Sequence, residues 1–314
     1  MVAPIPIKKQ ANDVGAVLNC LRVAREGATI AIAPEGNRTY SGCTEFINPT
    51  IAMLAKRLKL PIALYRIEGG YGVQPRWSDV TRKGKMVARV ARVLEPEEYL
   101  NLSDEELNEL IRKTLYVDET LIEGEYNSNK RAEYLERAIY VCPYCNLSEF
   151  ESNGNEIRCK KCNRRILYNK DKTLSGIGFE FPFKSVKDWY SFQNDYVANL
   201  DLTKHLEEPI YSETADLFEV IVYKNKNLLQ KSIRIQLFGD KIVLGENSDG
   251  SIVLPFDKLS AVSVLGKNKL NLYYGDKIFQ LKGDKRFNAL KYVNIYYRSR
   301  NIKKGEADGK FLGI

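Results

Sequence analysis

Residues 141–165 read VCPYCNLSEFESNGNEIRCKKCNRR, a stretch that differs in texture from the sequence before it. Its four cysteines form two Cys-x2-Cys pairs separated by 13 residues: Cys142, Cys145, Cys159 and Cys162. Each pair can present two sulfurs to one metal ion, and four thiolates complete the tetrahedral shell that zinc prefers. Gly154 supplies the turn of a hairpin between the pairs. The spacing predicts a structural zinc ribbon over residues 141–168, in preference to disulfides or free thiols.

The other two cysteines lack partners at metal-binding spacing. Cys20 falls in a helical pattern and Cys43 near a loop, so both are expected to be packed thiols in a reducing cytoplasm. A zinc ion with four protein ligands keeps no open coordination position. The predicted ribbon is therefore expected to stabilise the fold and not to catalyse a reaction.

Bulk composition indicates a folded, soluble or peripheral protein of two or three units. The chain has 314 residues, 44% of them hydrophobic, and no apolar run approaches the roughly 20 residues of a membrane-spanning helix. The formal charge is +8, and residues 211–314 hold 18 Lys and Arg against 11 Asp and Glu. Attraction to an anionic surface is expected mainly in this C-terminal third, where the same excess also fits an ordinary solvated face.

Upstream of the cysteines, helical and strand patterns alternate. The predicted elements are a helix over 12–27, a strand over 29–33 (TIAIA), a helix over 49–60, strands over 61–69 and 84–93, and helices over 103–117 and 129–139. This rhythm is typical of an α/β unit built on a mostly parallel sheet. We assign it to residues 1–140.

Downstream of the cysteines, the pattern is mainly β. Residues 169–210 hold one helix-like run and are interpreted as a helical connector. Residues 211–314 contain several short strand-like runs separated by turns, and then a helix. One face of this helix is predicted to carry Phe287, Leu290, Val293 and Tyr297. A small antiparallel barrel or sandwich closed by a C-terminal helix is predicted.

Three short blocks in the N-terminal region carry a resemblance to a known family. They are APIPIKKQ at residues 3–10, APEGNRTYSG at 33–42 and LPIALYRIEGG at 60–70. Over residues 3–120 the chain resembles the phospholipid/glycerol acyltransferases, the family of 1-acylglycerol-3-phosphate acyltransferases. The resemblance implies that Lys9 and Arg38 hold the acceptor phosphate, Glu35 binds the acceptor or orients the loop, and Gly36 permits the turn. Lys9 stands where the family usually has arginine.

The family's reaction is attack of a lysophosphatidate hydroxyl on the thioester of acyl-CoA or acyl carrier protein. Its base is the histidine of a His-x4-Asp motif, which precedes the first block. This chain has a single histidine, His205, followed five residues later by Ile210, so no catalytic residue is assigned. We expect either an N-terminally incomplete sequence or an inactive relative, with little activity by itself. Loss of that part would also leave an apolar sheet face exposed.

The C-terminal region resembles, more weakly, pleckstrin-homology-like domains. The expected location is the cytoplasmic, inner face of an anionic membrane. The alternative is a non-catalytic lipid-binding or adaptor protein that uses the ribbon and the basic C-terminal domain. Nucleic acid is not expected as a partner, because the ribbon sequence lacks the aromatic cluster typical of single-strand binding.

Overall fold

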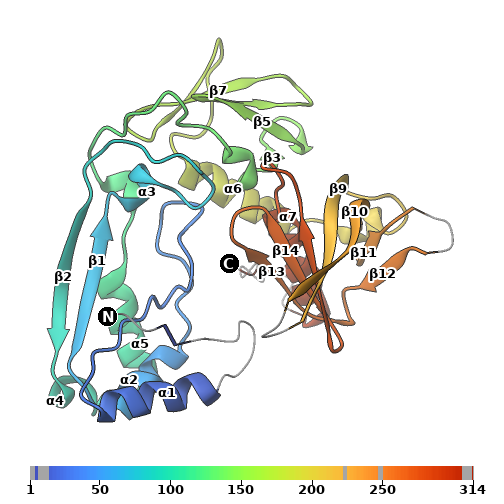
Figure 1. The fold of residues 1–314 in the computed structure, drawn as a ribbon. Coiled ribbons are helices and arrows are strands. Elements are labelled where there is room, and N and C mark those ends of the chain that lie inside the picture. Colours follow the sequence, from blue (N-terminus) through green and yellow to red (C-terminus); the bar gives the residue numbers. More distant parts are fainter. Residues whose placement is uncertain (1–3, 6–13, 222–224, 247–249, 306–312, 314) are drawn as a thin grey trace. The chain divides into compact units, whose positions relative to one another are not determined.

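The computed structural model describes residues 4–5, 14–221, 225–246, 250–305 and 313 (Figure 1). The chain forms two compact units. The first comprises Met1–Pro75 and Gly84–Glu123, and the second comprises Arg76–Lys83 and Gly124–Ile314. Lys9 and the predicted start of the first helix at Asn12 lie outside the described residues.

The first unit contains a two-stranded antiparallel sheet and several helices. Its elements are α1 (Val14–Arg25), α2 (Thr50–Leu58), β1 (Ile62–Glu68), α3 (Gly70–Val73), β2 (Val87–Leu94), α4 (Pro96–Tyr99), α5 (Asp104–Leu115) and the 3-10 turn Glu119–Leu121. One face of the sheet packs with α2 and α5 around six buried side chains: Ala52, Leu64, Leu94, Tyr99, Leu107 and Ile111. Burial of this apolar cluster stabilises the unit.

Most of the helices and strands of this unit were predicted correctly from short sequence patterns. The helix predicted from Pro49, the two strands and the helix after Ser103 are confirmed. The Ser103 hydroxyl accepts a hydrogen bond from the Glu106 amide at 3.1 Å, and the Glu106 carboxylate accepts one from the Ser103 amide at 2.7 Å. This reciprocal capping box fixes the start of α5.

The prediction of a mostly parallel α/β sheet is wrong for the described residues. The stretch 29–33 is not a strand, and β1 and β2 run antiparallel, from Ile62 opposite Leu94 to Glu68 opposite Val87. A strand requires a hydrogen-bonding neighbour, and none of the residues described in Figure 1 pairs with 29–33. The apolar and β-branched residues of 29–33 are therefore not enough to form a strand without a neighbouring strand.

The helix predicted over 129–139 is also wrong. That segment contains turns and the short 3-10 helix Leu135–Arg137. Tyr134 adopts a left-handed backbone with φ of 72°, which interrupts an α-helix, and its amide donates to the Ser152 hydroxyl at 2.7 Å. A tertiary contact thus replaces the helical pattern.

The second unit is mainly β. Around the cysteines lie β3 (Val141–Cys142), β4 (Asn146–Leu147), β5 (Phe150–Asn153), β6 (Glu156–Cys159), β7 (Arg165–Tyr168) and β8 (Leu174–Gly176). β3 pairs with β4, and β5 to β8 form a four-stranded antiparallel sheet in sequence order. The helix α6 (Val186–Ala198) and the 3-10 turn Leu202–His205 follow.

The C-terminal part is a curled seven-stranded antiparallel sheet with a helix after it. Its elements are β9 (Tyr211–Val220), β10 (Lys226–Leu237), β11 (Lys241–Leu244), β12 (Ile252–Pro255), β13 (Leu259–Leu265), β14 (Lys269–Tyr274), β15 (Lys277–Lys282) and α7 (Leu290–Lys303). The strand order is β12-β11-β10-β9-β15-β14-β13. β9, the first of these strands in the sequence, therefore lies in the middle and joins the two halves of the sheet. The predicted antiparallel sheet with a closing helix is confirmed.

The closing helix differs from the prediction of one buried face. In α7, apolar and polar side chains around the whole circumference are buried. The Tyr296 hydroxyl donates to the Leu259 carbonyl at 2.7 Å, and Arg298 donates to the Leu200 carbonyl at 3.2 Å. These hydrogen bonds offset the cost of removing polar groups from water, which lets α7 be buried on several sides.

Hydrogen bonds connect the cysteine region, α6 and the C-terminal helix within the second unit. The Gln193 side chain of α6 accepts from the amides of Tyr140 at 2.7 Å and Val141 at 3.2 Å, and donates to the Ala138 carbonyl at 2.9 Å. The Tyr140 hydroxyl donates to Asn294 of α7 at 2.7 Å. The predicted boundaries at residues 140, 168 and 210 stay predictions.

Candidate functional site

The four cysteines of the two Cys-x2-Cys pairs converge on one point. Their sulfur atoms all lie within 4.8 Å of one another, and the Sγ atoms of Cys142 and Cys162 are 3.9 Å apart. A disulfide would need about 2.05 Å. Zinc–sulfur bonds of about 2.3 Å in a tetrahedron place neighbouring sulfurs about 3.8 Å apart. The cluster therefore fits a tetrahedral metal ion and not a disulfide.

Matching backbone turns bring each cysteine pair together. An asparagine directly follows the second cysteine of each pair, and both adopt left-handed backbones, Asn146 with φ of 63° and Asn163 with φ of 59°. Asparagine tolerates this conformation better than most residues. The Asn163 amide donates to the Cys159 carbonyl at 2.9 Å, and Asn146 pairs with Cys142 between β3 and β4. The sequence thus folds locally into two similar knuckles.

The thiol pKa values reflect burial and hydrogen bonding. Burial raises the pKa of Cys142, partly offset by the amides of Tyr144 and Cys145. Burial also opposes ionisation of Cys162, but hydrogen bonds from the Arg164 backbone and side chain and from Cys145 and Cys159 lower its pKa to about 7. Several thiolates this close repel one another, so a bound cation is what would keep all four ionised.

Arg164 and an aromatic cluster lie beside the cysteines. The Arg164 guanidinium carbon is 4.0 Å from the ring centre of Tyr144 and 5.7 Å from that of Phe179. Edge-to-face and stacked contacts then continue through four further rings: Phe181, Phe183, Trp189 and Phe192. This cluster was not predicted, although the alternating Phe residues of GFEFPF at 178–183 are a sequence signal for it.

The loop that carries Glu35, Gly36 and Arg38 forms a second candidate site, in the first unit. Gly36 has φ of 68°, a conformation that glycine adopts freely. The Glu35 carboxylate accepts from the Glu45 amide at 3.0 Å, and burial raises the pKa of Glu35. Arg38 is exposed and donates to the Gln74 side chain at 2.9 Å and to its carbonyl at 3.1 Å. The roles implied for these residues stay predictions.

After Arg38, the loop is held by hydrogen bonds from two hydroxyl groups to one carboxylate. Thr39 and Ser41 donate to the Glu45 carboxylate at 2.9 and 3.1 Å. Gly42 has φ of 93°, and a Cβ there would lie 3.1 Å from the Tyr71 ring, so another residue at this turn would be strained and would press on the ring. The loop is therefore fixed on both sides of Arg38.

His205 lies in the second unit and is not part of a His-x4-Asp motif. It ends the 3-10 turn Leu202–His205, and its carbonyl accepts from the Gly239 amide at 2.8 Å. Asp201, four residues earlier, interacts electrostatically with His205, but the aspartate of a His-x4-Asp motif would stand at position 210, which is Ile210.

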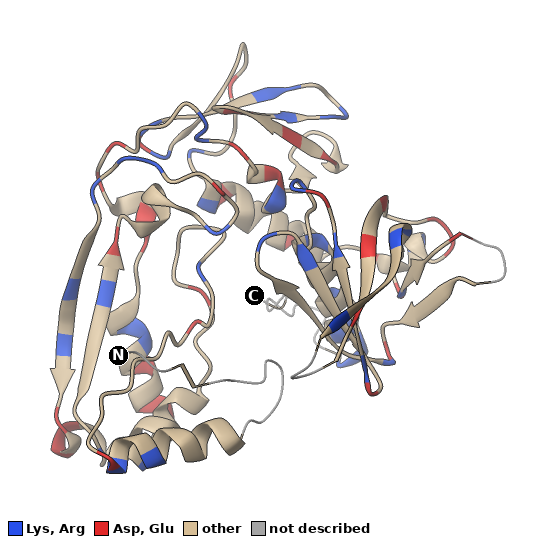
Figure 2. Cartoon of the chain, in the orientation of Figure 1, with Lys and Arg blue, Asp and Glu red and all other residues tan. Residues whose placement is uncertain are grey.

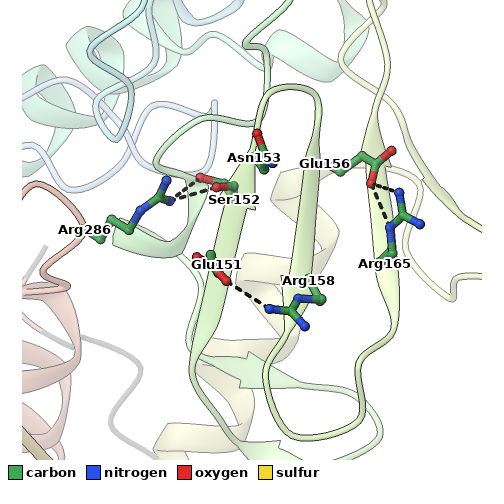
Figure 3. Close-up of a pocket in the computed structure, with 7 residues that line it drawn as sticks. All are labelled: Glu151, Ser152, Asn153, Glu156, Arg158, Arg165 and Arg286. Atoms are coloured by element: carbon green, nitrogen blue, oxygen red, sulfur yellow. Dashed lines mark hydrogen bonds and ion pairs between the residues drawn. The ribbon is translucent and has the colours of Figure 1, made fainter.

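A shallow cavity of about 480 Å³ lies over the outer face of the β5–β7 sheet (Figure 3). Its lining residues are Glu151, Ser152, Asn153, Glu156, Arg158, Arg165 and Arg286. The side chains form ion pairs across the strands, with Arg158 3.0 Å from Glu151 and Arg165 2.6 Å from Glu156. Because each of these arginines already has a glutamate partner, the cavity is not a strong anion site.

Comparison with known proteins identifies no family. No protein-family model matches the chain, and no curated protein matches it. Among solved structures, one similar chain is the N-terminal PH domain of human ARAP2, at 14% identity and a TM-score of 0.23, covering 29% of this chain and 81% of that one. At so low a TM-score this similarity carries no argument. Within the described ranges, no helix is both long and apolar enough to span a membrane.

Proposed function

We propose that this chain is the acceptor-binding part of an acyltransferase of phospholipid biosynthesis. In the proposed reaction an acyl group passes from acyl-CoA or acyl carrier protein to 1-acylglycerol-3-phosphate. The chain has no His-x4-Asp motif, so it binds the lysophosphatidate without turning it over. The observation that supports this proposal is the loop of residues 33–42, which keeps Pro34, Glu35, Gly36 and Arg38 of the family block.

The geometry of that loop suits a phosphate. Arg38 is exposed, and its contacts with Gln74 orient the guanidinium. Arginine can bind two phosphate oxygens at once through its planar donors. The Gly36 turn lets the loop backbone change direction directly before this side chain. Lys9 is proposed as a second cation, on the family resemblance alone.

The metal of the four-cysteine cluster is proposed to be zinc, in a structural role. All-thiolate tetrahedral sites favour zinc among the common metals of a reducing cell, and iron is the main competitor. The two knuckles would hold the ion, and its charge would offset the repulsion between thiolates. The ion would hold the end of β3, at Cys142, and the end of β6, at Cys159, together.

The C-terminal sheet is proposed to act as a PH-like module at the cytoplasmic face of an anionic membrane. Figure 2 shows Lys and Arg on several of its strands. The outer part of the β9–β10 hairpin exposes Leu228 and Leu229 close in sequence to Lys226 and Lys231. Exposed leucines with lysines beside them suit the boundary of an anionic bilayer.

A non-catalytic adaptor is the second candidate. The aromatic cluster with Arg164 favours it, because rings and a guanidinium beside a ribbon can stack on unpaired bases. Vesicle flotation with anionic lipids, compared with retention of single-stranded RNA at physiological salt, separates the two. Retention of RNA without vesicle binding would favour the adaptor.

The acceptor proposal is tested by equilibrium binding of a short-chain lysophosphatidate to the full chain. Arg38→Ala is expected to weaken binding roughly tenfold, because a charge-assisted hydrogen bond to phosphate is lost. Arg57→Ala, which removes an exposed arginine from α2 of the same unit, is the matched control. Equal affinity of the wild type and both variants, or no binding by the wild type, would contradict the proposal.

A further inference from the structure

The outer face of the β1–β2 sheet is wholly apolar. The register and the alternation of side chains place six residues on it: Ala63, Tyr65, Ile67, Ala88, Val90 and Val93. Tyr65, Ile67 and Val90 are each about half exposed, at 55%, 49% and 51%. On the opposite face Leu64 and Leu94 are buried in the core. An outer face made only of apolar side chains is typical of a strand surface that is covered.

Exposed apolar side chains are concentrated in this unit. Among the described residues, 13 of the 21 large hydrophobic side chains that are exposed belong to the first unit, although it is the smaller of the two. Isolated exposed hydrophobic residues are ordinary, but a contiguous face is not. The β1–β2 face therefore needs a specific explanation.

The charges of the two strands lie on the inner face of the sheet. Arg66 is opposite Arg89 in the register, and both arginines form ion pairs with Glu68, at 2.5 and 2.9 Å. Arg92 is opposite Leu64 and pairs with Glu98 of α4. Figure 2 shows the basic bands on both strands, and an acidic band at the end of β1. The outer face thus has no cation to attract an anionic bilayer and no charge to repel an identical face.

We propose that this apolar face is the interface of a homodimer, in which two copies pack sheet against sheet about a two-fold axis. An uncharged aliphatic face is complementary to itself, as such an interface requires. The half-exposed side chains offer several hundred Å² per copy, so the pair would bury on the order of 1,000 Å². That area lies at the lower limit for a specific interface, so the dimer is weak and depends on concentration.

The test is sedimentation of the full chain across a concentration series spanning roughly 1 to 100 μM, the range in which a weak dimer forms. The wild-type mass is expected to double across the series. Val90→Lys is expected to stay monomeric, because two lysines would face each other in an apolar interface. Val253→Lys is the matched control, since Val253 is 47% exposed on β12 of the second unit. Tyr65→Lys repeats the test if Val90→Lys does not fold.

A wild-type chain that stays monomeric throughout, or a Val90→Lys chain that dimerises as tightly as wild type, would overturn the proposal. So would loss of binding to neutral vesicles in Val90→Lys with the dimer intact, because the face would then be a bilayer contact. Arg38 lies on a different loop, so failure of this test leaves the acceptor proposal unchanged.

Discussion

At the residue scale, Asp79 connects distant parts of the second unit. Its carboxylate accepts from two nitrogens of Arg137, at 3.1 and 2.9 Å, and pairs with Lys267 at 2.7 Å. The Arg137 side chain is only 2% exposed, whereas that of Asp79 is 37% exposed. Arg137, followed by Lys267, lowers the pKa of Asp79 from 3.8 to about 2. The Asp79–Lys267 ion pair thus joins the segment 76–83 to the β13–β14 turn.

We predict that Asp79→Asn lowers the free energy of unfolding by roughly 1 kcal/mol at neutral pH, after allowance for solvent screening. A lowered pKa in the folded state means that this contribution is present above pH 3.8 and lost as the pH falls to about 2. Denaturant unfolding at a series of pH values should therefore show the two curves converging in acid. Asp257→Asn, at an exposed position, is the control; a constant difference down to the lowest pH would contradict the prediction.

At the element scale, elements that depend on neighbouring residues were predicted correctly, and elements that depend on residues distant in sequence were not. The knuckles, the capping box at Ser103 and the C-terminal strands depend on neighbouring residues, and the sequence placed them well. The strand over 29–33 and the helix over 129–139 failed because partners distant in sequence decide their backbone. The cysteine cluster was predictable from spacing, whereas the aromatic cluster at 178–192 depends on how α6 packs and was missed.

Gln193 shows how one buried amide can support a neighbouring element. It is 0% exposed, and it bonds three backbone groups directly before Cys142. We predict that Gln193→Leu lowers the free energy of unfolding by roughly 2–4 kcal/mol, because buried amides and a carbonyl lose their partners. The metal should also dissociate faster from the variant, measured with a colorimetric chelator. Gln230→Leu, at an exposed position of β10, is the control; unchanged stability would contradict the prediction.

At the scale of the whole molecule, the metal should matter to the second unit and not to the first. We predict about one zinc per chain by mass spectrometry of the metal, and a fall in melting temperature of roughly 10 °C for the second unit on chelation. Cys145→Ser should lose the metal, whereas Cys20→Ser, in α1, should keep it. A chain without metal that melts at the same temperature would show that the cluster does not stabilise the fold.

The proposed function depends on three short blocks of sequence that resemble the acyltransferase family. The structure shows where the residues of the block at 33–42 lie, but it does not test whether they bind a substrate. Glu35 and Arg38 lie on a loop that hydrogen bonds hold in place, but the sheet of the same unit is not the predicted parallel one. A reaction needs a base at the reacting hydroxyl, which spacing alone does not provide. His205 is not followed by the aspartate of a His-x4-Asp motif.

The most direct measurement of the central claim is a single incubation of the purified chain with labelled lysophosphatidate and acyl-CoA, separated into bound and free lipid. We predict that the wild type retains the label, that Arg38→Ala retains much less of it at the same protein concentration, and that the bound label is recovered as lysophosphatidate. Formation of phosphatidate at an enzymatic rate would contradict the assignment of binding without turnover. No retention of label would contradict the acceptor site itself.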